Sequence, residues 1–405
     1  MLKNIALLFI LSYFFENAQA LNGCTDPLAN NYNAAATVND GSCTYNGATI
    51  NIKTTKNLPA VLDETSGLIW WNNAIWTHND DTDTSLYAVD TATAALKGTY
   101  PLPRVTNQDW EEISQDDNYV YVGDFGNNAN GNRTNLHILR IEKNSLLAHA
   151  PVIDTIWFSY SNQTDFTGTG GNNTDFDCEA FIVSADSIYL FTKQWVSEKT
   201  SFYSLPKTPG TYIANLRGTI NISGLATGAT YLENKRLVVL IGYTSGGQPF
   251  MYLLYDFSGH DFSSGNKRKI NLNLLAHQTE GIATQNGLKY YVSNEAVKAI
   301  NLPQQLHTFD LSNFLKNYLS STTTGIFNNK KKDAINVFPN PASDIINIKI
   351  SQNLIDLTCT ITNLLGKEVL SVKLSGENTP LNIQSLPAGA YVLHVGEQSI
   401  SIIKQ

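Results

Sequence analysis

The sequence of 405 residues is poor in charge, because only 15% of its residues are Asp, Glu, Lys or Arg, against about 25% in a typical globular chain. Basic residues are fewer than acidic ones: the chain has 27 Lys and Arg and 35 Asp and Glu, which gives a formal net charge of −8. Nucleic-acid binding requires a stripe of basic side chains that neutralises phosphates. The one basic run, at 330–332, is too short for this, so no nucleic-acid partner is expected.

Long hydrophobic runs and helical periodicity are also scarce. The apolar stretch at 5–15 is too short to cross a hydrocarbon core of roughly 30 Å as a helix, and no later stretch is long enough, so no transmembrane segment is expected. Short runs of Val, Ile, Tyr and Trp between turn residues recur along the chain, whereas an apolar period of 3.6 residues is rare. The pattern predicts an all-β protein.

The first twenty residues have the pattern of a secretory signal peptide. Lys3 provides a positive start, an apolar run follows, and Ala18-Gln19-Ala20 has the small residues of a cleavage site. We therefore expect residues 1–20 to be removed and the mature protein to be exported.

Cysteine is scarce as well, with four in the chain. Cys24 and Cys43 flank a polar segment that has too few apolar residues to fold alone, and a disulfide between them would explain its folding. The segment resembles the short GCTDPxAxNYxxxAxxxDGSC module of exported Bacteroidetes proteins, and residues 21–46 are expected to form such a module. Cys178 and Cys359 are expected to be single buried thiols. Three polar side chains of the module suit turns better than a Ca²⁺ site: Asp26, Asn31 and Asp40.

The C-terminal segment 335–405 is predicted to be a separate small β-sandwich. Its strand at 344–351 alternates with period 2 and places Ile346, Ile348 and Ile350 on one face. Three motifs, VFPNPA at 337–342, NLLGK at 363–367 and LPAGAY at 386–391, resemble those of the C-terminal sorting domain of type IX secretion cargo. The resemblance implies recognition by the outer-membrane translocon and a secreted or surface-attached product. Residues 320–334 have the composition of a flexible linker.

The middle of the chain, 48–319, repeats one sequence pattern, in which a polar turn separates two short apolar strands. The repeats are spaced 45, 68, 48 and 53 residues apart, which is the length of a four-stranded β-propeller blade. We predict five blades, with six as the alternative because the longest gap has room for another. The segment 48–54 is expected to supply the outer strand of the last blade and close the ring.

The first residue of each inner strand is expected to face the central channel. Three carboxylates there would repel each other unless protons or a cation neutralise them, and oxygen ligands suit Ca²⁺. We therefore predict one Ca²⁺; the alternative is that these glutamates accept backbone N–H groups between blades. The predicted metal ligands are Ser66, Glu111, Glu179, Thr227 and Glu280.

This order of residues resembles the Ser-Glu-Glu-Ser-Glu ring of the calcium-dependent apyrases, with Thr227 as the departure. The run WTHNDD at 76–81 is similar to the first-blade turn of that family. The resemblance implies a five-bladed propeller with a central Ca²⁺ and hydrolysis of phosphoanhydrides. The basic residue and the acidic glycine-rich loop of that family are not evident after Asp81.

Two functions are consistent with these features. The favoured one is a calcium-stabilised binding or adhesion module for a small molecule or glycan, and the alternative is a calcium-dependent hydrolase of phosphoanhydrides or phosphoesters. Motifs of serine hydrolases, zinc proteases and kinases are absent from the sequence. If the protein is an enzyme, the candidate catalytic residues lie in loops at the channel mouth: Asp80, Asp81, Asp124 and Arg133.

Overall fold

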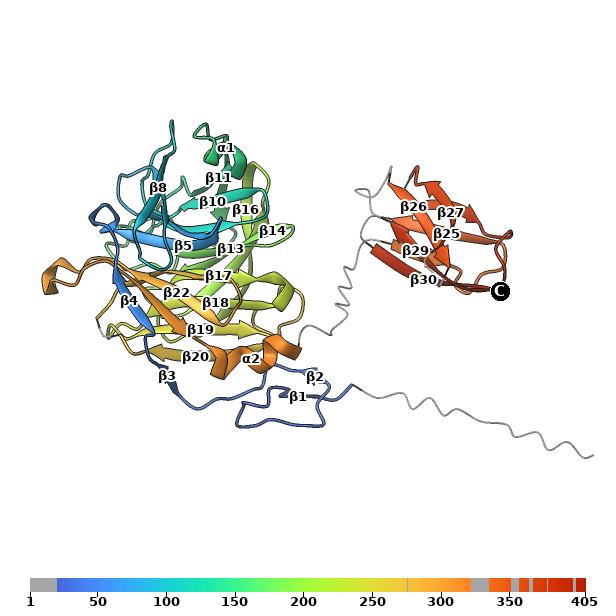
Figure 1. Ribbon diagram of the computed structural model, residues 1–405, viewed down its shortest axis with the longest axis horizontal. Coiled ribbons are helices and arrows are strands. Elements are labelled where there is room, and N and C mark those ends of the chain that lie inside the picture. Colours follow the sequence, from blue (N-terminus) through green and yellow to red (C-terminus); the bar gives the residue numbers. More distant parts are fainter. Residues whose placement is uncertain are drawn as a thin grey trace, which may run out of the picture. The chain divides into compact units, whose positions relative to one another are not determined.

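The computed structural model describes residues 20–274, 276–321, 335–350, 357–363, 367–376, 378–395 and 398–405. The protein is all-β, as predicted, and divides into two compact units, Met1–Gly325 and Ile326–Gln405 (Figure 1). The predicted signal peptide up to residue 19 and the predicted linker from residue 322 lie outside the described residues.

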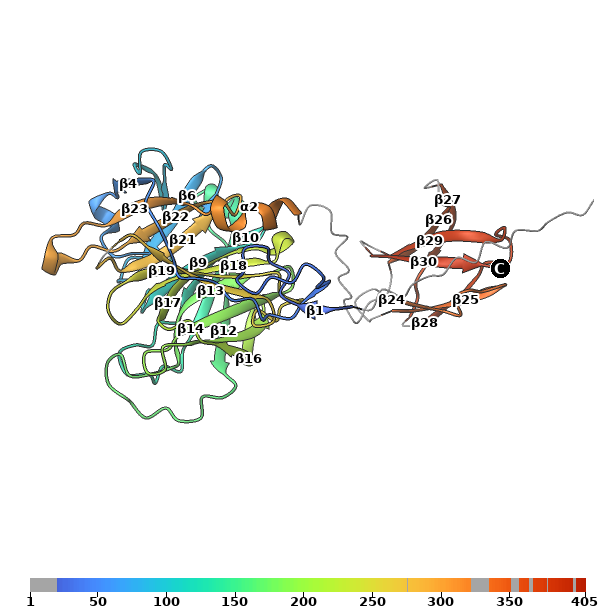
Figure 2. The same ribbon diagram turned by 90° about the horizontal axis from the view of Figure 1, so that it is seen from below.

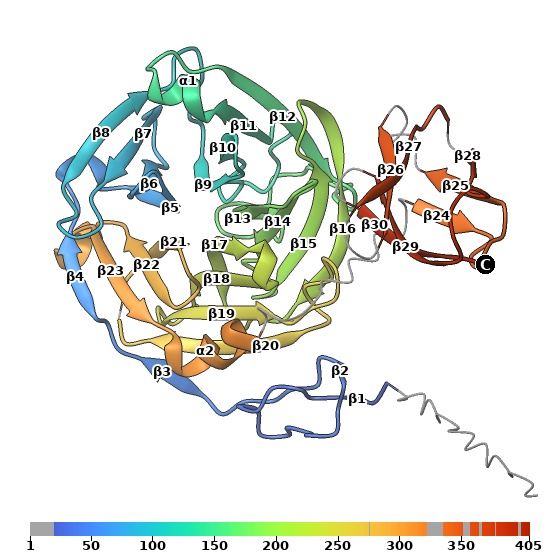
Figure 3. The ribbon, with the colours of Figure 1, turned by 45° about the vertical axis from the view of Figure 1, so that its right-hand side comes forward.

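The larger unit is a β-propeller, whose strands surround a common centre (Figure 3). Its inner strands contact each other in sequence around a closed ring, and the last contacts the first. These strands are β5 (Thr65–Trp71), β9 (Trp110–Gln115), β13 (Asp177–Val183), β17 (Leu225–Leu232) and β21 (Thr279–Thr284).

Each inner strand continues into an antiparallel run of four strands. The second strands are β6 (Ala74–Asn79), β10 (Tyr119–Asp124), β14 (Ser187–Lys193), β18 (Leu237–Tyr243) and β22 (Lys289–Asn294). The third strands are β7 (Ser85–Val89), β11 (His137–Glu142), β15 (Thr200–Pro206), β19 (Pro249–Tyr255) and β23 (Gln305–Asp310). The outer strands are β8 (Leu96–Pro101), β12 (Ile153–Tyr160), β16 (Gly210–Ile220), β20 (Asn266–Leu272) and β4 (Thr54–Asn57).

Helices are few and short in this unit. The α-helices are α1 (Lys143–Leu147) and α2 (Ser312–Ser321), and the 3₁₀ turns are η1 (Ala60–Leu62), η2 (Glu233–Lys235) and η3 (Lys298–Ile300). The long gap between the second and third repeats holds α1, β12 and a loop, and residues 112–176 contain no further four-stranded run. Because β12 and β16 pair in parallel, two of the runs form one eight-stranded sheet. Sheet membership alone therefore gives no blade count, and five blades stay a prediction.

The N-terminal strand that closes the ring differs from the predicted one. The structure splits the predicted segment: β3 (Ala48–Ile50) pairs in parallel with β20, while β4 (Thr54–Asn57) completes the last run by pairing with β23. All four residues of β4 are exposed, so this strand has no apolar alternation by which it could be recognised. The expectation that residues 48–54 close the ring was wrong by a few residues.

The core of the propeller lies between neighbouring runs, because both faces of each sheet are covered. In β18, Val238 and Leu240 belong to the core shared with the third run, whereas Val239 and Ile241 belong to the core shared with the last run. All four side chains are fully buried. Because successive side chains of a strand point to opposite faces, this continuous apolar run supplies two separate cores.

The smaller unit is a two-sheet sandwich, and Figure 2 shows its sheets facing each other. One sheet has β24 (Ile335–Phe338), β25 (Ile345–Ile350) and β28 (Asn378–Asn382); the other has β27 (Glu368–Lys373), β26 (Thr358–Asn363), β29 (Gly389–Val395) and β30 (Gln398–Lys404). Ile346, Ile348 and Ile350 are buried in the shared core, as their alternation predicted. Part of the motif at 363–367 lies outside the described residues.

The N-terminal module has two short parallel strands, β1 (Asn22–Gly23) and β2 (Val38–Asn39), and the predicted disulfide between Cys24 and Cys43 is present. Cys178 and Cys359 are free and buried, as expected. The polar side chains considered for Ca²⁺ make turns and anchors instead: Asp26 accepts from Leu28 N and the Tyr45 hydroxyl, Asn31 from Thr44 N, and Asp40 from Ser42 N.

Candidate metal centre

Three carboxylates meet at the end of the channel where the inner strands begin. One oxygen each of Glu111, Asp177 and Glu179 lies within 4.8 Å of the others, and all three residues are buried. Asp177 and Glu179 are two residues apart at the start of β13, so a period of two directs both side chains toward the same face. Two of the three, Glu111 and Glu179, were predicted from the sequence.

Asp177 is held in place by two hydrogen bonds. The backbone N–H of Asn127 donates to Oδ1 at 2.6 Å, and the indole N–H of Trp195 donates to Oδ2 at 2.8 Å. Each carboxylate oxygen keeps acceptor capacity for another ligand. Such partners orient a carboxylate toward a metal in known sites.

Lys193 provides the cation that touches this group. Its Nζ donates to Oε1 of Glu179 at 2.8 Å and lies 4.6 Å from the ring centre of Trp195 and 5.3 Å from that of Tyr243. Burial alone would lower the pKa of Lys193, but Glu179 and the other acidic neighbours reverse the effect and raise it. The ammonium group is therefore charged and fixed beside Glu179.

Glu111 has no hydrogen-bond or ion-pair partner for its carboxylate within the described residues, although only 6% of the residue is exposed. Its pKa is raised well above the usual value by burial and by Glu179, Asp109 and Asp177. Gly126 permits this crowding, since a Cβ there would lie 2.2 Å from Oε1 of Glu111 and 2.3 Å from Oδ2 of Asp109. Asp109 thus borders the same cluster, and burial raises its pKa to about 6.

The acidic character continues toward the first and last runs. Burial raises the pKa of Glu280 to about 7 and, together with the charge of Glu280, that of Asp80 to about 7. Burial likewise raises the pKa of Glu295 well above its usual value, with Glu280 and Asp80 contributing. These shifts share a cause, because several carboxyl groups lie in one poorly solvated region.

The two hydroxyls of the predicted ring have other partners. Ser66 Oγ donates to the backbone carbonyl of Glu111 at 2.5 Å, and Thr227 Oγ1 donates to that of Thr279 at 2.5 Å. Each bond joins the inner strands of two neighbouring runs. These hydroxyls therefore connect the ring, while the carboxylate cluster is formed mainly by the second and third runs.

Glu112, the neighbour of Glu111, has the role of an inter-blade acceptor. Its Oε1 accepts from Ile113 N at 2.9 Å and its Oε2 from Ala229 N at 2.6 Å, so it joins β9 to β17 across the channel. The residue is fully buried, and burial raises its pKa despite these bonds and one with Leu68. The sequence suggested, as an alternative to metal binding, that the ring glutamates accept backbone N–H groups between blades. Glu112 has this role.

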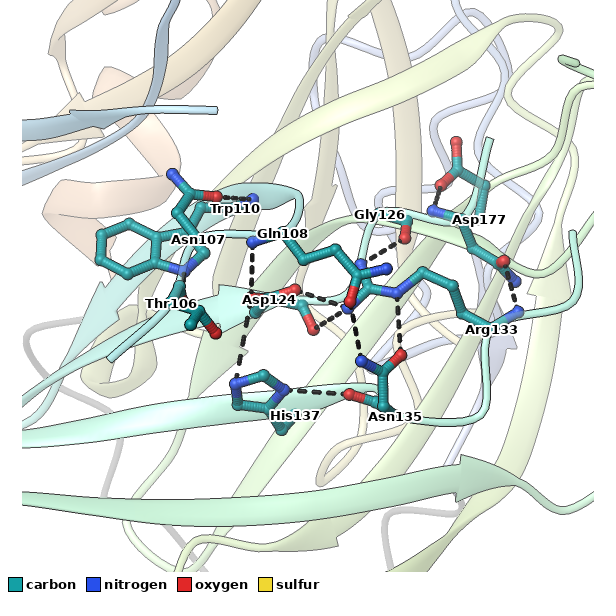
Figure 4. A network of polar contacts seen from close by, with 11 residues as sticks. Thr106, Asn107, Gln108, Trp110, Asp124, Gly126, Arg133, Asn135, His137 and Asp177 are labelled. Carbon is teal, nitrogen blue, oxygen red and sulfur yellow. Dashed lines mark hydrogen bonds and ion pairs between the residues drawn. The ribbon is translucent and has the colours of Figure 1, made fainter. Parts of the chain in front are cut away.

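Two of the candidate catalytic residues pair with each other (Figure 4). Arg133 Nη2 lies 2.5 Å from Oδ1 of Asp124, and Arg133 Nη1 donates to the backbone oxygen of Gly126 at 2.7 Å. The network holds the loop whose Asn127 orients Asp177. Asp81 accepts from the backbone of Asp83 in a turn. Burial and the neighbouring acidic groups raise the pKa of Asp80 toward neutrality.

The cluster fits the requirements of Ca²⁺. Oxygen ligands at 2.3–2.6 Å on opposite sides of the ion are about 5 Å apart, and the three oxygens here lie within 4.8 Å. Water would complete the six to eight ligands that Ca²⁺ takes. Glu111, Asp177 and Glu179 would hold the ion, with Asn127 and Trp195 orienting Asp177.

Asp177, Asp109 and Lys193 were missed as members of the cluster. A signal was present in the sequence, because Asp109-Trp110-Glu111 and Asp177-Cys178-Glu179 repeat a D-x-E pattern at equivalent positions of two repeats. Residues two apart in a strand share a face, so each aspartate accompanies its glutamate. Lys193 gave no comparable signal, since it is placed by its pairing with Asp177 across β13 and β14.

Comparison with known proteins identifies the C-terminal segment. Residues 336–405 match the family model described as a secretion system C-terminal sorting domain. No curated protein matches the chain. None of the described helices is both long and apolar enough to span a membrane.

Solved structures give weak similarities. PorZ, described as an essential surface component of the type-IX secretion system of Porphyromonas gingivalis, has 13% identity and a TM-score of 0.31; the match covers 84% of this chain and 45% of PorZ. A chain of the mitotic checkpoint complex has 8% identity and a TM-score of 0.35, covering 66% and 98%. The Pan2 WD40 domain of Neurospora crassa has 9% identity and a TM-score of 0.31, covering 61% and 75%.

This chain thus spans less than half the length of the PorZ chain that it matches. No finding supports the resemblance to calcium-dependent apyrases. The three motifs of the C-terminal sandwich and the family match over the same residues agree on its role in export. Residues 336–405 are the C-terminal sorting domain of a protein exported by the type IX secretion system.

Proposed function

We propose that the propeller is an extracellular ligand-binding module, displayed or released after type IX export and stabilised by one Ca²⁺ at Glu111, Asp177 and Glu179. The observation that carries the proposal is the geometry of these three buried carboxylates, whose oxygens lie within 4.8 Å of one another. Buried charges are stable when they are paired or bind a metal. A divalent cation would join the second and third runs of the ring.

The charge balance supports a cation at this position. Glu111, Asp177, Glu179 and Glu280 interact with one another and with a single ammonium group, that of Lys193, among the described residues. One positive charge does not neutralise four carboxylates. In the absence of metal some of them must be protonated at neutral pH, and a Ca²⁺ would replace those protons.

The same charges favour binding over phosphate chemistry. The two cations nearest the cluster, Lys193 and Arg133, already pair with Glu179 and Asp124. A phosphate entering this end of the channel would meet mainly carboxylates. An anionic substrate is therefore disfavoured by Coulomb repulsion unless a metal bridges it.

A calcium-dependent hydrolase remains the second candidate because of one observation. Asp80 and Glu280 both have a pKa of about 7, raised mainly by burial, which suits general acid–base catalysis at neutral pH. A phosphate-release assay on nucleotides and other phosphoesters, with and without CaCl₂, tests this candidate. Turnover that is lost in Asp80→Asn would favour the hydrolase over the binding module.

Thermal unfolding tests the metal proposal. A ligand at 100 times its Kd stabilises the folded state by about 2.7 kcal/mol, which raises Tm of a domain of this size by roughly 5–10 °C. We expect such a rise when CaCl₂ replaces EDTA, and its loss in Glu111→Gln. Asp154→Asn is the matched control, because it removes a carboxylate of the outer strand β12 that pairs with Arg140, away from the cluster. Equal Tm values in CaCl₂ and EDTA for the wild-type protein would refute the proposal.

A further inference from the structure

The VFPNPA motif at 337–342 joins the two sheets of the sorting domain. It begins in β24, which belongs to the first sheet, and ends beside β30, the edge strand of the second sheet. Val337 and Ala342 are buried in the core that both sheets share, whereas Asn340 between them is exposed. The buried residues on either side thus hold Asn340 against the edge of β30.

The side-chain amide of Asn340 pairs with β30 as the backbone of a neighbouring strand would. Its Nδ2 donates to the backbone oxygen of Ser401 at 2.8 Å, and its Oδ1 accepts the backbone N–H of Ile403 at 2.8 Å. One residue of a parallel strand makes the same two bonds, one on each side of the residue that it faces. Asn340 therefore occupies the place of a strand residue opposite Ile402.

The backbone of Ala342 continues this pairing further along β30. Its N–H donates to the backbone oxygen of Ile403 at 2.9 Å, and its oxygen accepts the N–H of Gln405 at 2.8 Å. Ala342 thereby forms a parallel bridge with Lys404. Asn340 and Ala342 together cover the backbone groups on the open side of this strand, and we call the two residues the edge cap.

β30 requires a cover because it lies at the end of its sheet. The strand order β27-β26-β29-β30 leaves one side of β30 without a strand partner among the described residues. Its sequence, QSISIIK, is uncharged up to the last residue, and Ile403 is 49% exposed. An open, uncharged edge of this kind is a template for pairing with another chain, and natural proteins cover such edges. Pro339 and Pro341 lack an N–H, so the covering segment does not become a new pairing edge itself.

We propose that Asn340 is a positioning residue for export, which acts through β30 by keeping the open side of this strand covered. Without the edge cap, β30 would pair with other chains before export, and the sorting domain would be lost to recognition as a separate folded unit. The inference rests on the identification of residues 336–405 as a sorting domain. It is independent of the metal and the ligand proposed for the propeller.

Hydrogen exchange of the full-length protein tests the edge cap itself. Asn340→Leu has a similar side-chain size but forms neither hydrogen bond with β30, so the amide of Ile403 should exchange roughly tenfold faster than in the wild-type protein. Thr362→Val is the matched control, because the hydroxyl of Thr362 bonds His394 between β26 and β29, away from the open side of β30. Exchange of the Ile403 amide at the wild-type rate in Asn340→Leu would overturn the inference.

Export of the same variants tests the role of the edge cap. The assay uses a bacterium with a type IX secretion system and compares the protein on the surface and in the medium with that in the periplasm. We expect Asn340→Leu to reduce the exported fraction several-fold, with the retained protein in multimers. Thr362→Val should be exported like the wild-type protein.

A second substitution separates edge pairing from general instability. A lysine on an open edge opposes pairing with another chain, so Ile403→Lys in the Asn340→Leu background should restore export while hydrogen exchange in β30 stays fast. Wild-type export of Asn340→Leu, or an equal loss of export in Thr362→Val, would overturn the inference. A double variant that is monomeric and yet retained in the periplasm would overturn it as well.

Discussion

Nζ of Lys193 lies 2.8 Å from Oε1 of Glu179, with only 5% and 4% of their side-chain surfaces exposed. This ion pair is surrounded by further carboxylates, of which Glu111 and Asp177 belong to the same cluster. The protein therefore keeps one positive charge of its own inside an acidic site. The pair neutralises one of these carboxylates and leaves an excess of negative charge, which the proposed cation would neutralise.

Replacing Lys193 should make the stability of the folded protein more dependent on Ca²⁺. Lys193→Met removes the ammonium group and leaves Glu179 buried and unpaired, which typically costs about 3–5 kcal/mol of unfolding free energy. Urea unfolding in EDTA measures the loss, and we expect CaCl₂ to restore more stability in the variant than in the wild-type protein. Lys298→Met, at a pair in which 71% of the lysine side chain is exposed, is the control and should have little effect. An equal loss in CaCl₂ and EDTA would show that metal does not compensate for the lysine.

Adjacent glutamates should respond in opposite ways to the same substitution. Glu112→Gln replaces an acceptor oxygen by an amide that faces a backbone N–H, so it should destabilise the protein by about 1–3 kcal/mol in EDTA and in CaCl₂ alike. Glu111→Gln removes a carboxylate that has repelling neighbours and no described partner, so it should be neutral or stabilising in EDTA while abolishing the Ca²⁺-dependent rise in Tm.

Thermal unfolding of both variants makes this comparison directly. The two residues are neighbours on β9 and both are buried, so each is the matched control of the other. Loss of stability in both variants, with the Ca²⁺ effect retained in both, would contradict the different roles assigned to them.

Stability should fall with rising pH when metal is absent. Burial raises the pKa of Asp80 from 3.8 to about 7 and that of Glu280 from 4.5 to about 7. The folded protein then holds protons that the unfolded chain has released, so this stabilisation is fully present below about pH 4 and is lost as the pH rises to about 7. In EDTA we expect Tm to decrease between pH 5 and pH 8.

Added Ca²⁺ should weaken that pH dependence, because the cation takes over the role of the protons. Glu280→Gln should also flatten the profile in EDTA, since it removes one of the two titrating groups. Differential scanning calorimetry across this range measures both effects. A Tm that rises from pH 5 to pH 8 in EDTA would have the wrong sign for carboxyl groups with raised pKa values.

How much of the molecule could be predicted depended on how strongly sequence pattern constrains each part. Buried strands such as β18 and β25 were predictable, because β18 is a short continuous apolar run and β25 has apolar side chains at a period of two. The closing strand β4 is polar and exposed, so only its pairing with β23 reveals it. In the cluster, Glu111 and Glu179 followed from the repeat, whereas Lys193 depends on strand pairing.

The hydrogen bonds and ion pairs that individual polar side chains form could not be predicted from the sequence either. Asp124 and Arg133 were candidate catalytic residues in case the protein is an enzyme, and the loop between them folds back so that the two groups form an ion pair. Ser66 and Thr227 occupy the predicted positions in the ring, but their hydroxyls bond backbone carbonyls of the next strand. The position of a residue along a strand predicts the face on which its side chain lies. It does not predict which neighbouring group forms a hydrogen bond or ion pair with that side chain.

The N-terminal module should be held less firmly against the propeller when the side chain of Asp26 is removed. Asp26 Oδ2 accepts the hydroxyl of Tyr45 within the module and that of Tyr255 on β19, at 2.8 and 2.5 Å. Asp26→Ala removes both bonds, so limited proteolysis in the 46–53 segment should become faster while the Ca²⁺ effect persists. Asp40→Ala, whose carboxylate bonds Ser42 inside the module, is the control. An unchanged rate of cleavage would contradict this anchoring role.

The most direct test of the metal site is a crystal structure of the propeller grown in CaCl₂, with anomalous differences recorded. We expect one strong anomalous peak bounded by the carboxylates of Glu111, Asp177 and Glu179, with Ca–O distances of about 2.3–2.6 Å, and no peak there in Glu111→Gln crystals. A map without a peak at this cluster, at a calcium concentration that saturates any rise in Tm, would contradict the proposed centre.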